Sequence, residues 1–159
     1  MPPPTTKEPP LPRPQTTKAY ILVYEGSPLD LSEYRHTALH FEYSSRPQSN
    51  PPNPNTSTMH VVGTQGLFEF QEDIDQDPSD DGDVLARMIP VGDIPGAVSA
   101  VAIKKAVAAT PVKNGRMDLE WNCQNWVGDA LAQMVENGFI GEDQRGEAID
   151  AMLDVCLEA

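Results

Sequence analysis

The sequence predicts an α+β fold in which an antiparallel sheet packs against helices. Up to about residue 91, apolar side chains alternate or run together in short segments, which is typical of strands. From residue 95 onward they recur every three or four positions, which is typical of helices that pack through one face. Strands first and helices last is the order expected for an α+β protein.

Five segments are expected to be strands. The first is almost continuously apolar, and the second alternates so that His36 and His40 share one face. The third and fourth are predicted to form a hairpin around Gln65-Gly66, and Pro90 places the end of the fifth at or near a sheet edge. The expected strands are residues 19–24, 36–43, 59–64, 67–71 and 84–91.

Three helices are expected to follow, over residues 95–109, 123–136 and 142–157. Pro95 suits the first turn of the first helix, and Pro111 ends it. The second helix begins at Cys123, carries the most regular apolar stripe in the chain, and stops at the C-cap signal Asn137-Gly138.

The chain of 159 residues is expected to form a single domain over residues 19–159, with a mobile loop at 44–58. Residues 1–18 are rich in proline and poor in apolar side chains, so they are predicted to be a disordered tail. An alternative is that Pro9–Pro14, with the sequence Pro-Pro-Leu-Pro-Arg-Pro, binds a partner domain that recognises proline motifs.

A formal net charge of −13 argues against nucleic acid or an anionic membrane as a partner, since both need a basic surface. No signal peptide and no apolar stretch of about 20 residues is seen, so a cytoplasmic protein is expected. The acidic segment 71–83 has the spacing that starts a calcium loop, but Pro78 stands where that loop needs glycine. A solvated acidic loop without metal is therefore predicted, and no cofactor is expected.

One cysteine and two histidines are the candidate functional residues. Cys123 lies at a predicted helix start, where the helix dipole lowers a thiol pKa, and His36 and His60 lie on strands that would bring them together if paired antiparallel. Cysteine with histidine is the minimum for thiol acyl transfer. The alternatives are a buried structural cysteine, or a zinc site, for which no short-spaced ligand pair exists. Cys156 is predicted to be structural.

The order of these segments resembles that of the permuted papain-like thiol enzymes, the NlpC-type superfamily that includes the lecithin retinol acyltransferase family. The matching segments are a first His strand, a second His strand and an Asn-Cys helix start, here residues 35–39, 59–61 and 122–127. The chain resembles an uncharacterised family of small fungal proteins more closely, over residues 19–157. The most specific match is Trp-Asn-Cys-x-x-Trp-Val at residues 121–127, with further matches at 84–87 and 110–112.

The resemblance implies a permuted papain-like, NlpC-type arrangement with Cys123 as nucleophile, His36 as base and His60 as third member. Thr37 replaces the aromatic residue of the family pattern, and no hydrophobic anchor is present, so lipid substrates do not carry over. The function predicted is a thiol hydrolase or acyltransferase acting on an amide, ester or thioester. The alternative is a non-catalytic binding or regulatory module. Three residues are expected to support the site or its oxyanion: Asn122, Gln124 and His40.

Overall fold

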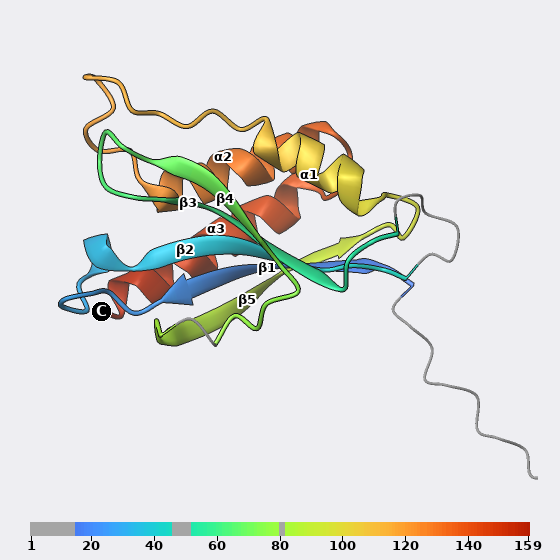
Figure 1. Ribbon diagram of the computed structural model, residues 1–159, viewed down its shortest axis with the longest axis horizontal. Helices are drawn as coiled ribbons and strands as arrows, with labels where there is room; N and C mark the ends of the chain where they lie inside the picture. The colour runs from blue at the N-terminus through green and yellow to red at the C-terminus, as the bar shows by residue number, and fades with distance from the viewer. Residues whose placement is uncertain (1–14, 46–51, 80–81) are drawn as a thin grey trace, which may run out of the picture.

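The computed structural model describes residues 15–45, 52–79 and 82–159, and within them it shows a five-stranded antiparallel sheet with helices on one face (Figure 1). The strand order is β4-β3-β2-β1-β5, so β4 and β5 are the edges. The α+β fold and its antiparallel sheet are confirmed. The strands are β1 (Thr17–Tyr24), β2 (His36–Glu42), β3 (Thr56–Val62), β4 (Glu69–Ile74) and β5 (Leu85–Ile94).

The two faces of the sheet are covered differently. Side chains such as Ile21, Leu39 and Met59 belong to one large core that also contains the buried residues of the helices. The other face carries a small apolar cluster of the buried residues Leu22, Tyr24 and Ala38, against which the partly buried Leu85 and Met88 pack. The strands in the middle of the sheet are therefore buried on both faces, which explains why β1 reads as an almost continuous apolar run.

The helices are α1 (Ala100–Ala108), α2 (Cys123–Glu136) and α3 (Glu142–Leu157), so the bounds of the second and third are confirmed. In α2, the Asn122 side chain accepts hydrogen bonds from the backbone N–H groups of Gln124 and Asn125, and the Asn125 side chain accepts one from Asn122 N–H. This capping box fixes where α2 begins. Helix α1 begins five residues later than expected, because Ser99 rather than Pro95 caps it through Ala102 N–H.

The expected tail and loop boundaries need correction. Strand β1 already includes Thr17, a fully buried residue whose hydroxyl accepts from Ser44 N–H at 3.0 Å, so residues 17 and 18 belong to the sheet. The predicted loop 44–58 ends earlier, since Thr56 starts β3. Strands β4 and β5 each run three residues further than predicted. The tail residues 1–14 and the loop residues 46–51 lie outside the described residues.

The remaining strand predictions hold. Strands β3 and β4 form the predicted antiparallel hairpin, and β5, which carries Pro90, is an edge strand as expected. Within the described ranges, no helix is long and apolar enough to cross a bilayer.

Candidate functional site

A cleft of about 780 Å³ opens at one end of the sheet, beside the first turn of α2. Three segments form its walls: the connection from β1 to β2, the turn of the β3–β4 hairpin, and the residues that lead into α2. Cys123 and His36 both line this cleft, so the fold brings the predicted nucleophile and base to one cavity although they are far apart in sequence.

Cys123 is the first residue of α2 and is half-buried. Its position at the N-terminus places the residue at the positive end of the helix dipole, next to the Asn122 side chain that caps the N–H groups of Gln124 and Asn125. Its Sγ lies 3.9 Å from the carbonyl oxygen of Arg35, the residue that immediately precedes His36. The thiol therefore lies beside the peptide bond that joins Arg35 to His36.

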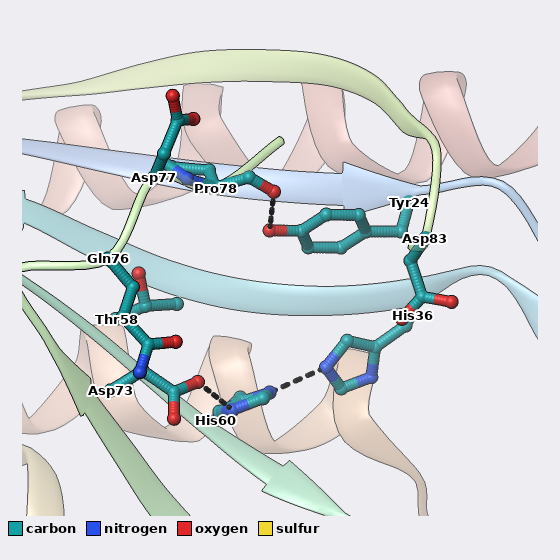
Figure 2. Close-up of a pocket in the computed structure, with 9 residues that line it drawn as sticks. All are labelled: Tyr24, His36, Thr58, His60, Asp73, Gln76, Asp77, Pro78 and Asp83. Carbon is teal, nitrogen blue, oxygen red and sulfur yellow. Dashed lines mark hydrogen bonds and ion pairs between the residues drawn. The ribbon is translucent and has the colours of Figure 1, made fainter. Parts of the chain in front are cut away.

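His36 and His60 lie side by side, as the sequence predicted for antiparallel pairing. Strands β2 and β3 pair antiparallel with Leu39 opposite Met59, so His36, at the start of β2, comes close to His60, near the end of β3. Nε2 of His36 and Nδ1 of His60 are 2.7 Å apart, a hydrogen-bond distance, and Figure 2 marks this contact with a dashed line.

Asp73 extends this pair into a chain of three. Its Oδ2 lies 3.1 Å from Nε2 of His60, and both side chains are largely buried, with 18% and 12% of their surface exposed. The sequence interpretation had assigned Asp73 to a solvated acidic loop, which is wrong, because Asp73 lies in β4 opposite Thr58 of β3. The alternation of apolar residues ends at Phe70, so no periodic signal in the acidic segment places Asp73 in the strand.

The chain of three fixes which ring nitrogen of His36 can accept a proton. Asp73 is an acceptor when ionised, so it selects the tautomer of neutral His60 that carries hydrogen on Nε2. Nδ1 of His60 is then an acceptor, and Nε2 of His36 must donate to it. The remaining nitrogen, Nδ1 of His36, is left with its lone pair free to act as a base.

The histidines and the cysteine approach the cleft from opposite faces of the sheet. Figure 2 shows His36, His60 and Asp73 in front of the strands with the helices behind, whereas Cys123 begins a helix on the far side. His36 lines both the cleft and a smaller pocket of about 40 Å³, so its ring lies where the two cavities meet. No hydrogen bond joins the Cys123 thiol to His36, since the thiol is directed at the Arg35 carbonyl.

The surroundings of His36 keep its ring neutral at pH 7. Burial, and to a lesser extent the neighbouring His60, lower the pKa of His36 to about 4. The ring of Tyr24 stacks on it at a centroid distance of 6.0 Å. The hydroxyl of Tyr24 donates to the carbonyl of Pro78 at 2.9 Å, which holds the segment after β4 over this face.

The three expected supporting residues have different places. Asn122 lines the cleft, but its side chain caps α2. Gln124 donates from Nε2 to the carbonyls of Ser32 and Arg35, at 3.1 and 3.5 Å, and so ties the first turn of α2 to the entry of β2. His40 hydrogen-bonds the hydroxyl of Thr58 at 2.8 Å and is not part of the cleft wall.

The second cysteine differs from the first in every respect that matters for reactivity. Cys156 is almost fully buried, at 2% exposure, and lies near the C-terminal end of α3. Burial, together with a smaller contribution from the neighbouring Cys123, raises the pKa of its thiol to about 11. Among the residues that the structure describes, no group of three or more His, Cys, Asp or Glu side chains has the arrangement of a metal site.

Comparison with known proteins identifies the family and nothing more specific. The search of the curated proteins and the search of the solved structures each gave no match. A family profile described as "family of unknown function (DUF6540)" matches residues 19–141. This range includes β1 from its third residue, the other four strands, the first two helices and every residue of the Cys–His–His–Asp group. The chain belongs to this DUF6540 family.

Proposed function

We propose that this protein is a thiol hydrolase or acyltransferase of the permuted papain-like type, with Cys123 as nucleophile and His36 as base. The observation that carries this proposal is the hydrogen-bonded chain from Asp73 through His60 to His36, which ends at the cleft that Cys123 lines. Asp73 orients the His60 ring, and His60 in turn orients the His36 ring. This leaves Nδ1 of His36 as the nitrogen that can accept a proton beside the cavity. A packing role alone would not require that order of groups.

In the proposed reaction the Cys123 thiol leaves the Arg35 carbonyl and comes within hydrogen-bond reach of His36, which lines the same cleft. Nδ1 of His36 takes the thiol proton as the sulfur attacks the carbonyl carbon of an amide, ester or thioester. His36 then returns the proton to the leaving group, and a thioester forms on Cys123. Water or an acceptor nucleophile resolves that thioester, with His36 again accepting and returning the proton.

The oxyanion of the tetrahedral intermediate would be held by the backbone N–H of Cys123. This group is the first amide of α2, where an α-helix offers no internal partner, and it has no hydrogen-bond partner among the described residues. It points outward from the positive end of the helix. Gln124, which is bonded to two backbone carbonyls, and Asn122, which caps the helix, then position this turn without contacting the substrate.

The experiment is covalent trapping at Cys123. Wild-type protein is incubated with p-nitrophenyl acetate and followed by intact mass, then by peptide mapping. The proposal predicts one acetyl group on Cys123 and none on Cys156, and it predicts that Cys123→Ser loses the adduct while keeping its melting temperature. Cys156→Ala is the matched control and should acylate normally. Equal slow labelling of both cysteines, or no adduct on Cys123, would refute the proposal.

A second function has its own supporting observation. The thiol of Cys123 faces the Arg35 carbonyl rather than the imidazole, and the lowered pKa of His36 prevents a resting thiolate–imidazolium pair. Both fit a binding or regulatory module in which the cysteine is structural. The two functions separate by the pH dependence of alkylation with iodoacetamide. Only an activated thiol reacts rapidly well below the ordinary cysteine pKa of about 8.5.

A further inference from the structure

We propose that the cleft beside Cys123 selects acyl compounds that carry an apolar group and a positive charge. This inference deepens the proposed function and rests on it. It comes from the lining of the cleft, which combines an aromatic wall with carboxylates and lacks an available cationic side chain among its described residues.

The aromatic wall is built by Phe68 and Trp121. Their rings meet edge to face at a centroid distance of 5.6 Å, and the side chain of Val61 lies on the same cavity. The amide of Asn114 clamps this wall, since it accepts from Phe68 N–H at 2.8 Å and donates to the Phe68 carbonyl at 3.0 Å. Because both backbone polar groups of Phe68 are hydrogen-bonded, this part of the wall is fixed before a ligand binds, which suits the binding of an apolar group.

The charges of the lining favour a cation. Glu33 and Glu120 are exposed and line the cleft, one from the connection before β2 and the other from the segment before α2. Arg35 is the one lysine or arginine among the lining residues, and each of its three guanidinium nitrogens already donates a hydrogen bond. It donates to both carboxylate oxygens of Asp30, at 2.9 and 2.8 Å, and to the carbonyl of Val155 at 2.8 Å.

These charges also disfavour the opposite class of substrate. A phosphorylated or carboxylated acyl donor would meet two carboxylates and no free guanidinium or ammonium group among the described lining residues. The chain as a whole carries a net charge of −13, so the long-range field acts in the same direction. A control for that general field is therefore part of the test.

The test uses charged thiosulfonates that react with Cys123 whether or not it catalyses. The thiolate attacks the sulfenyl sulfur, a mixed disulfide forms, and methanesulfinate leaves. The probes are the cation trimethylammonioethyl methanethiosulfonate and the anion sulfonatoethyl methanethiosulfonate. The rate of each probe with Cys123 is divided by the rate of the same probe with 2-mercaptoethanol, which removes its intrinsic reactivity. We expect a normalised cation-to-anion ratio of about tenfold, reduced about threefold by Glu120→Gln. Glu136→Gln, at the other end of α2, should leave the ratio unchanged.

The apolar part is tested with benzyl and methyl methanethiosulfonate. Benzyl should react several-fold faster after the same normalisation, and Phe68→Ala should remove that advantage while the charge ratio stays.

A ratio near one, or equal effects of Glu120→Gln and Glu136→Gln, would overturn the inference even if p-nitrophenyl acetate acylates Cys123. A high ratio in a protein that no activated ester acylates would instead overturn the proposed function.

Discussion

The two faces of the sheet show how one chain separates stability from chemistry. The face under the helices is a continuous apolar core in which residues such as Trp126 and Leu39 are completely buried. The opposite face carries all three histidines of the chain, His36, His40 and His60, beside a small apolar cluster. Polar groups buried on that face are paired with one another, at a cost that an apolar core would avoid.

The comparison teaches where a change should affect folding and where it should affect reactivity. Helix α2 connects the two, because its body is part of the core while its first residue lines the cleft. A substitution in the body of α2 should unfold the protein. A substitution in the chain of three on the opposite face should leave the fold and change the behaviour of Cys123.

Truncating the core should have the largest effect on stability. Trp126 lies near the start of α2 and has no exposed surface, so Trp126→Ala is expected to lower the free energy of unfolding by about 3–5 kcal/mol. Urea denaturation measures it. A loss below about 1 kcal/mol would show that the helix-covered face is not the main source of stability.

Acid should destabilise the protein by protonating His36, which lies on the face of the sheet away from the helices. Because the folded pKa of His36 is about 4 and the unfolded value is about 6.5, its contribution is intact above pH 6.5 and is lost as pH falls toward 4. The expected loss is roughly 3 kcal/mol. Denaturation of wild type and His36→Gln at several pH values measures it, since the variant lacks this titration. Parallel pH curves for the two proteins would contradict the buried neutral state of His36.

Removing the charge at the end of the chain of three should change rate more than stability. Asp73→Asn keeps an oxygen but adds a donor that can reverse the tautomer of His60, so acylation of Cys123 is expected to slow by about tenfold. Glu69→Gln, on the same strand and exposed, is the matched control. Stopped-flow acylation compares them. If both variants acylate at the wild-type rate, Asp73 has no part in orienting the histidines.

The smallest effect on stability is expected at the hydrogen bond that holds the segment after β4 to the sheet. Tyr24→Phe removes the hydrogen bond to the Pro78 carbonyl and should cost about 1 kcal/mol. The stacking of the ring on His36 should survive. Hydrogen exchange should show faster exchange confined to residues 75–79. Faster exchange spread over α2 would mean that the two faces are not independent.

Much of the fold could be predicted because the local signals agreed. The bounds of α2 follow from the cap at Asn122, a regular apolar stripe and the stop at Asn137-Gly138. The start of α1 was missed because Pro95 and Ser99 offer competing signals, and only the structure shows that the Ser99 hydroxyl is the cap. The extra residues of β1 were missed because Thr17 is polar and becomes buried by its bond to Ser44, which is distant in sequence.

The sequence predicts the pairing of the two histidines. It does not predict the parts of the site that depend on strand register or on which face of the sheet the helices cover. That His36 and His60 meet follows from two strands pairing antiparallel. That Asp73 completes the chain depends on the β3–β4 register, which a run of acidic residues does not encode. The separation of Cys123 from the histidines depends on which face the helices cover, and alternation along a strand does not specify that face.

The central claim is that His36, which lies on one face of the sheet, is the base for Cys123, which begins a helix on the other face. The most direct measurement is the rate constant for acylation of Cys123 by p-nitrophenyl acetate at pH 7, in His36→Ala and in His40→Ala. General-base catalysis predicts a loss of about a hundredfold or more for His36→Ala. His40, which is bonded to Thr58 outside the cleft, should change the rate less than about threefold. Equal rates in the two variants would contradict the account.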